Sequence, residues 1–178
     1  MSGIAAMPGT APEFSRLVPL ARLGFEPFRQ EIEAGEAERA ALAQRLDLVS
    51  LDTLHASVEL VRQGQDRILL RAGFEAAFVQ SCVVTLDPVP GTLKAEFTLI
   101  YGPPEIEAEA AGGVEDDAAF EPLSGQAIDI GEAVAQELAL ALPPFPRHPE
   151  ADAAAPSADG EGSPFAGLAA LLERGRRG

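Results

Sequence analysis

Three side chains in this sequence are of types that commonly carry out acid–base or nucleophilic chemistry. His55 and His148 could each act as a general base, and Cys82 is the only cysteine in the sequence. Each also has a simpler interpretation. Both histidines are expected at the surface, with His55 on the polar side of a strand. Cys82 lies in the apolar run FVQSCVVTL and is expected to be a buried, inert thiol.

Recognisable catalytic motifs are absent from the sequence. It contains no phosphate-binding loop, dinucleotide-binding fingerprint, nucleophile elbow or paired-histidine metalloprotease motif. We therefore predict no catalytic residue and no cofactor. The alternative is an RNA-processing or small-molecule enzyme with a dispersed site, which would require a deep pocket, converging carboxylates and a shifted pKa. Candidate residues for such a site are His55, Glu121, Asp129 and Glu137.

The charge of the chain is strongly acidic and unevenly distributed. There are 28 acidic and 13 basic residues, for a net charge of -15, and residues 102–163 contain 14 acids against Arg147 alone. Binding to a nucleic-acid backbone is driven by cations, so broad contact with phosphates is disfavoured, and whether RNA is touched locally stays open. An acidic surface could instead bind basic proteins such as ribosomal proteins. The simpler explanation is a solvated loop that keeps the protein soluble.

The N-terminal residues and the hydropathy of the chain bear on its location. The stretch MSGIAAMPGTAPEF lacks the charged start and apolar run of a signal peptide. No window approaches the roughly 18 apolar residues of a membrane span. One cysteine cannot form an internal disulfide, which fits a reducing compartment. We therefore expect a cytoplasmic protein with no membrane contact.

The stretch IDIGEAVAQELALALPPFPRHP predicts a helix with its own start and stop signals. Asp129 is the expected N-cap, so the helix should begin at Ile130. Glu132 could reach back to the Asp129 N–H group and complete a capping box. Pro143 and Pro144 end the helix and favour an extended segment that leads the chain away from the helix.

The apolar face of this helix indicates that it packs against a sheet or a partner. Ile130, Val134, Leu138 and Leu142 recur every four residues. A core helix is the simpler interpretation, and a helix that binds a partner is the alternative.

Alternating residues predict an α+β fold built on an antiparallel sheet, either a meander or a partly closed barrel, with two or three packed helices. Gly64 marks the turn of a hairpin, Gly73 a bulge, and DPVPG a second turn. The predicted strands are 14–20, 53–62, 67–72, 74–86 and 94–101, and another helix is predicted over 36–48.

The domain organisation follows from the segments without periodicity. Residues 1–149 are predicted to form one α+β domain that contains an acidic loop over about 102–125. Residues 150–178 are predicted to be a flexible linker with a short amphipathic C-terminal helix, in which Phe165, Leu168 and Leu172 share one face. This helix is expected to be disordered when free and to dock on a partner or on the domain itself.

Three stretches in order are similar to a known family. They are SCVVTLDP (81–88), FEPLSGQAIDIGEAVAQELALALPPFPRHP (120–149) and SPFAGLAALL (163–172). Together they resemble the bacterial YceD-like family, the large ribosomal RNA subunit accumulation proteins. The segments EFSRLVPL and AERAALAQRLDLVSLDTL look like members from alphaproteobacteria. The family-motif residues, which we predict as candidate partner contacts, are Glu121, Pro122, Asp129, Gly131, Glu132, Glu137, Pro143, Pro144, Pro164, Phe165 and Leu168.

The resemblance implies a non-enzymatic role in accumulation or processing of large-subunit ribosomal RNA and in assembly of the large subunit. Partners would be ribosomal proteins, a processing nuclease or a precursor large-subunit particle. Many members of the family carry a Cys-x-x-Cys pair that suggests zinc. Here Cys82 matches the first cysteine, but Thr85 replaces the second and His148 is the remaining candidate ligand. A structural zinc site needs about four ligands, so we predict no zinc.

Overall fold

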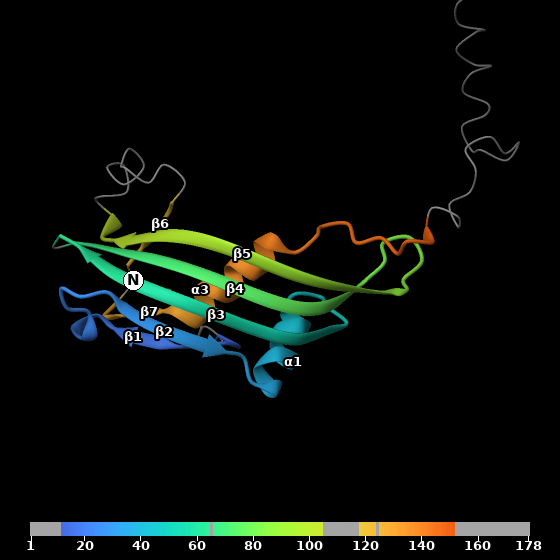
Figure 1. The fold of residues 1–178 in the computed structure, drawn as a ribbon, viewed down its shortest axis with the longest axis horizontal. Helices are drawn as coiled ribbons and strands as arrows, with labels where there is room; N and C mark the ends of the chain where they lie inside the picture. The colour runs from blue at the N-terminus through green and yellow to red at the C-terminus, as the bar shows by residue number, and fades with distance from the viewer. Residues whose placement is uncertain (1–11, 65, 105–117, 124, 152–178) are drawn as a thin grey trace, which may run out of the picture.

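Four strands that follow one another along the chain form most of the fold (Figure 1). The computed structural model describes residues 12–64, 66–104, 118–123 and 125–151. The elements are β1 (Leu17–Pro19), a short 3-10 helix (Leu20–Arg22), β2 (Phe28–Glu33), α1 (Glu36–Arg45), β3 (Ser50–Gln63), β4 (Arg67–Ser81), β5 (Pro88–Gly102), β6 (Ala119–Pro122), β7 (Ala127–Asp129) and α3 (Ile130–Ala141).

The main sheet has the strand order β2-β3-β4-β5-β6, and β1 pairs with β7 in a separate two-stranded sheet. Strands β2 to β5 are antiparallel neighbours, which confirms the predicted α+β class and the meander. β6 runs parallel to β5, so the sheet is mixed. The partly closed barrel is wrong for the described residues. Because β6 is short and pairs only with the last four residues of β5, β2 and β6 remain at opposite edges.

One face of the sheet is covered and the other is open. Residues of β3 and β4 alternate between buried and exposed, as expected for a sheet packed on one side. Figure 1 shows α3 crossing behind the long strands, and α1 contacts β3. Phe74 on the covered face meets Phe97 edge-on, with ring centroids 6.1 Å apart. We call the other side the open face.

β4 is one continuous strand, and this corrects two predictions. The predicted strands 67–72 and 74–86 are joined without a bulge at Gly73, which pairs in regular register with Ser57 and Glu96. The irregularity lies instead in β3, between Leu51 and Thr53. The hairpin itself is confirmed, with Gly64 in the left-handed region at a φ of 71°.

The β4–β5 connection lies earlier in the chain than the sequence predicts. β5 begins at Pro88, so the predicted DPVPG turn is wrong, and the turn is formed by residues 82–87. Leu86 has a φ of 63°, and its N–H group donates to the Cys82 carbonyl at 3.0 Å. Pro88 and Pro90 are tolerated because β6 does not extend to this part of β5, which leaves it at the edge of the sheet.

The remaining differences concern short elements. β2 was not predicted, and β6 lies inside the segment 102–125 that was predicted to be an acidic loop. The helix predicted over 36–48 ends at Arg45 because Asp47 adopts a φ of 54°. Residues 105–117 of the acidic loop, and 152–178 with the predicted C-terminal helix, lie outside the described residues.

No helix in the described part of the chain is long and apolar enough to span a membrane.

Candidate functional site

The start of α3 is fixed by Asp129, as the sequence predicts. Its Oδ1 atom accepts hydrogen bonds from the N–H groups of Gly131 (3.1 Å) and Glu132 (3.2 Å). The same carboxylate also binds the N-terminal segment, because it accepts from the Arg16 N–H group at 2.7 Å and from Ser15 Oγ at 2.5 Å. Asp129 therefore caps the helix and holds β1 beside β7 at the same time.

Glu132 does not complete the predicted capping box. Its two carboxylate oxygens accept from the guanidinium of Arg45 at 2.9 and 2.8 Å, and Gln136 donates to it at 3.1 Å. The Arg45 hydrogen bonds lower the pKa of Glu132, and burial opposes this effect. Arg45 also donates to Glu13 at 2.9 Å. Glu132 thus connects α3 to α1 instead of closing its own first turn.

Gly131 has a packing role that the sequence alone does not reveal. A Cβ atom at this position would lie 2.5 Å from the Phe14 carbonyl oxygen and 3.0 Å from the Arg16 nitrogen. Both neighbours are backbone atoms, which cannot rotate away. The close approach between the first turn of α3 and the N-terminal segment therefore requires glycine at residue 131.

Glu121 and Glu137 both influence Tyr101 electrostatically near the end of β5. Glu121 on β6 pairs in register with Tyr101 on β5, and Pro122 follows it beside Gly102. Burial raises the pKa of Glu137, and the nearby Glu121 carboxylate raises it further. Burial and these carboxylates also raise the pKa of Tyr101. Of the predicted motif residues, Glu121 and Glu137 therefore affect the same part of the molecule, which the sequence did not predict.

The proline segment after α3 stays on the body of the protein, which corrects the expectation that it leads away. Gln80 Nε2 donates to the Pro143 carbonyl at 3.1 Å, and the Val83 N–H group donates to the Pro146 carbonyl at 2.9 Å. The segment therefore runs beside the end of β4 and the β4–β5 turn. Pro144 lines a groove at this end of the molecule.

Cys82 is buried in the β4–β5 turn, as predicted, and its sulfur accepts from backbone groups. The donors are the N–H groups of His148 at 3.3 Å and of Val84 and Thr85 at 3.4 Å each. The contact from His148 first, the Thr85 side chain second and the other two N–H groups lower the pKa of Cys82 to about 6, and burial opposes them. The described residues hold no cluster of three or more potential metal ligands. The absence of zinc stays a prediction, which a stoichiometric zinc signal in native mass spectrometry would contradict.

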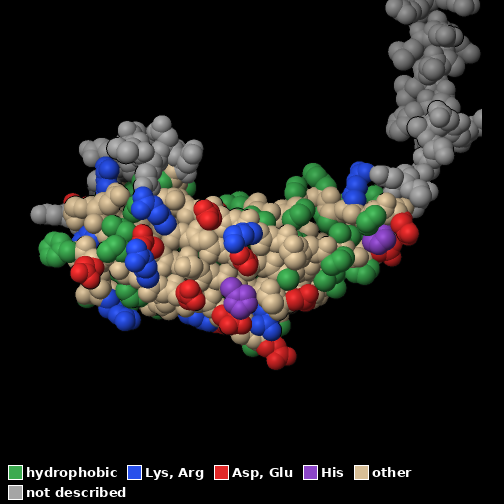
Figure 2. All heavy atoms as spheres, viewed as in Figure 1, with side chains coloured by type: hydrophobic (Ala, Val, Ile, Leu, Met, Phe, Trp, Pro, Cys, Tyr) green, Lys and Arg blue, Asp and Glu red, His purple; other side chains and the backbone are tan. Residues whose placement is uncertain are grey.

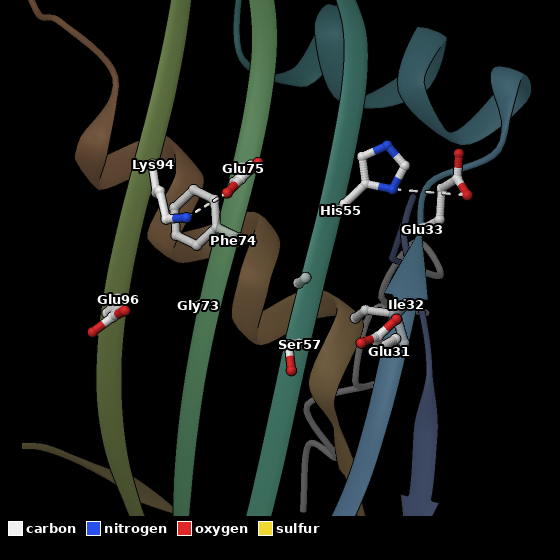
Figure 3. A pocket seen from close by; sticks show the side chains of 11 residues that line it. Glu31, Ile32, Glu33, His55, Ser57, Gly73, Phe74, Glu75, Lys94 and Glu96 are labelled. Carbon is white, nitrogen blue, oxygen red and sulfur yellow. Dashed lines mark hydrogen bonds and ion pairs between the residues drawn. The ribbon is translucent and has the colours of Figure 1, made fainter.

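The open face carries a hollow of about 480 Å³ lined largely by charged side chains. Four neighbouring strands contribute to it in two rows. One row contains Glu33, His55, Glu75 and Lys94, and the other contains Glu31, Ser57, Gly73 and Glu96. Figure 3 shows these side chains standing above the strands. In the middle of the second row, Gly73 has no side chain and Ser57 has a small one, so these two residues form the low floor of the hollow.

One ion pair and one histidine–carboxylate contact lie in the first row of the hollow. Lys94 Nζ lies 2.6 Å from Glu75 Oε1, and His55 Nδ1 lies 3.8 Å from Glu33 Oε2 (Figure 3). The Lys94 hydrogen bond lowers the pKa of Glu75. The lining has four glutamates against one lysine and one histidine, so the hollow is acidic. Sequence reasoning missed it, although EIE (31–33) and KAE (94–96) show the alternation expected of such a face.

The structure does not bring together the four residues of the alternative dispersed enzyme site. His55 lies on the open face, whereas Asp129 and Glu137 belong to the start and body of α3 on the covered face. Glu121, Asp129 and Glu137 all act on the pKa of Tyr101, so His55 is the member of the four that lies apart from the rest. His148 is part of the segment against the Cys82 turn. The motif residues Pro164, Phe165 and Leu168 lie outside the described residues.

Comparison with known proteins gives one informative match. No curated protein matches the chain. No solved structure matches it either. The model of the family described as "Large ribosomal RNA subunit accumulation protein YceD" matches residues 70–172, a region that includes most of β4, all of β5 and the whole of α3 with its proline exit. Because this match covers more than half of the sequence, the chain belongs to the YceD family.

Proposed function

We propose that this protein is a non-enzymatic factor that supports accumulation or processing of large-subunit ribosomal RNA and assembly of the large ribosomal subunit. The observation that carries this proposal is the family match over residues 70–172. The protein would act in the cytoplasm, through contacts with other proteins. Its partners would be ribosomal proteins, a processing nuclease or a precursor large-subunit particle.

The hollow on the open face supports a basic protein as the partner. Glu31 and Glu96 stand at the two ends of its second row, separated by the low floor of Ser57 and Gly73. Three strand spacings separate them, which corresponds to about 14 Å. Lysine or arginine side chains of a bound segment could meet both carboxylates across this floor. Such a contact would favour rapid, salt-sensitive association.

The overall charge supports an indirect role toward the RNA. With a net charge of -15, the protein would be repelled by phosphates over most of its surface. Ribosomal proteins are basic and are therefore the better electrostatic match. In this proposal the protein affects the RNA by binding one of the proteins that accompany it.

The enzymatic alternative would rest on Glu121 and Glu137, because the pKa of Glu137 is raised there. The hollow on the open face is a separate feature, formed by β2 to β5. The two hypotheses therefore place the essential residues on different faces of the sheet, and variants can separate them.

The first test is deletion of the gene, followed by measurement of large-subunit and small-subunit ribosomal RNA and of ribosomal particles on sucrose gradients. We expect a selective loss of large subunits that the wild-type gene restores. An unchanged ratio of the two RNAs would contradict the proposal.

The second test uses variants in the deletion strain. Glu31→Gln/Glu96→Gln should restore large subunits poorly, and the control Glu26→Gln/Asp66→Asn, which removes the same charge from exposed positions outside the hollow, should restore them fully. Full restoration by the first variant would contradict a role for the hollow. Failure of a stably folded Glu137→Gln variant would favour the enzymatic alternative.

A further inference from the structure

An apolar patch is exposed at the end of the molecule where the β4–β5 turn meets the segment after α3. Leu86, Leu140 and Phe145 are 78%, 79% and 76% exposed, and Val83 and Val84 are also exposed. Figure 2 shows hydrophobic side chains gathered at this end. We call these five residues the end patch. Exposed apolar side chains that cluster in this way commonly mark a contact surface.

A groove accompanies the end patch. It has a volume of about 500 Å³ and lies between the end of α3 and the β4–β5 turn. Its apolar lining includes Leu46, Val83, Leu140 and Leu142, and the three prolines after the helix form one side. A groove lined in this way fits the apolar side of an amphipathic helix.

The described chain ends beside this groove. The His148 N–H group contacts the sulfur of Cys82, and the Ala151 N–H group donates to the His148 carbonyl at 2.9 Å. Ala151, the last described residue, is buried. Twelve peptide steps then lead to Ser163, and a chain of that length spans at most about 40 Å. Residues 163–172 can therefore reach the groove from the same chain.

The sequence of that segment suits the groove in its apolar pattern. SPFAGLAALL has a serine and a proline suited to a helix start, and it places Phe165, Leu168 and Leu172 at helical spacing. It also suits the groove in charge. Arg174, Arg176 and Arg177 follow the segment, whereas Asp47 lines the groove. Glu150 and Asp87 are exposed in the segments next to it.

We propose that residues 163–172 dock as a helix into the groove beside the end patch of their own chain. Attachment through a short linker gives an effective concentration on the order of millimolar, so even a weak contact would be populated. The isolated helix is too short to be stable in water, and docking would supply the contacts that order it. This inference is independent of the proposed ribosomal role.

The test uses the full-length protein, whose sequence contains no tryptophan. Phe165→Trp introduces a single fluorescent reporter at the centre of the proposed contact. We expect blue-shifted emission and protection from acrylamide quenching, both independent of protein concentration. Adding Leu140→Ser and Phe145→Ser should abolish both signals. These residues are exposed, so the substitutions should leave the domain folded, which circular dichroism would verify.

A matched control adds Leu17→Ser and Phe25→Ser to the reporter variant. Both residues are exposed and precede β2, which begins near the β3–β4 turn at the other end of the sheet. This control should leave the reporter unchanged. If the tryptophan of the reporter variant emits like one exposed to water, the proposal is wrong. It is also wrong if the tryptophan is buried but its emission does not change when the end-patch residues are substituted. A signal present only in a dimer, detected by light scattering, would assign the groove to a second copy and overturn docking within one chain.

Discussion

The guanidinium of Arg45, at the end of α1, is bound to both carboxylate oxygens of Glu132 in the first turn of α3, with distances of 2.9 and 2.8 Å. The two residues are 87 positions apart in the sequence. Arg45 also reaches Glu13, so one side chain joins the N-terminal segment and both helices. Arg16 makes a second such link, because its guanidinium is bound to both carboxylate oxygens of Glu38 on α1 at 2.6 and 2.9 Å.

Arg45→Gln should lower the free energy of unfolding by at most about 1 kcal/mol, because the pair is partly exposed to solvent. The pKa of Glu132 lies below its ordinary value of 4.5 in the folded protein. Its contribution is therefore present above pH 4.5 and is lost as the pH falls through the lowered pKa. Urea denaturation should show a larger difference from wild type at pH 7 than at pH 3. Arg45→Lys keeps the charge without the paired geometry and should lose less stability.

Asp129→Ala should destabilise the protein by about 1–2 kcal/mol or more, because it removes a helix cap together with the acceptor for Ser15 and Arg16. Asp129→Asn retains one acceptor oxygen and should cost less. Thermal unfolding of wild type and both variants measures which substitution causes the larger loss of stability. Equal losses in the two variants would mean that the carboxylate charge, and not its hydrogen-bond geometry, matters.

Gly131→Ala should destabilise the fold by about 1–3 kcal/mol, since the new methyl group meets backbone atoms that cannot move aside. The matched control is Gly24→Ala, where an added Cβ atom has no neighbour within 4 Å. Chemical denaturation of the two variants should place the control within error of wild type. A tolerated alanine at residue 131 would show that the first turn of α3 can shift away from Phe14.

Glu137→Gln should stabilise the folded protein at pH 7 by less than about 1 kcal/mol, because the group is partly exposed. The pKa of Glu137 is raised by burial and by Glu121, so the folded state prefers the protonated form. The contribution of Glu137 to stability is therefore most favourable below pH 4.5 and falls as the pH rises through the raised pKa. The gain from the glutamine should shrink below pH 4.5, where the wild-type carboxyl is neutral too. Unfolding curves at pH 7 and pH 4 test this, with Glu26→Gln as the control.

The parts of the fold that sequence reasoning predicted are those fixed by local interactions. The N-cap contacts of Asp129 span three residues, and the β3–β4 turn depends on one glycine, Gly64. Such signals lie within a short window of sequence. The family resemblance rests on the same kind of evidence, since its most specific motif is the capped helix and its proline exit.

The parts that sequence reasoning missed depend on distant partners. Glu132 has a nearby N–H group available to it, yet it binds Arg45, which only the packing of α1 against the same core brings close. Glycine within a strand often marks a bulge, but Gly73 is paired in regular register with β3 on one side and β5 on the other. The hollow on the open face requires the register of four strands at once, which no single stretch of the chain contains.

The pairing of β1 with β7 has a consequence for how the protein is made. Ser15 and Asp129, which bond to each other across this pair, are 114 positions apart. During synthesis the hairpins of β2 to β5 can form as soon as they emerge, whereas the first strand must wait for the last one. Until α3 is translated, the apolar side of the meander, with Leu54 and Phe74, lacks the cover that this helix gives it and has only α1 against β3. A ribosome that stalls before residue 130 would therefore leave a chain with exposed apolar surface, which is prone to aggregate.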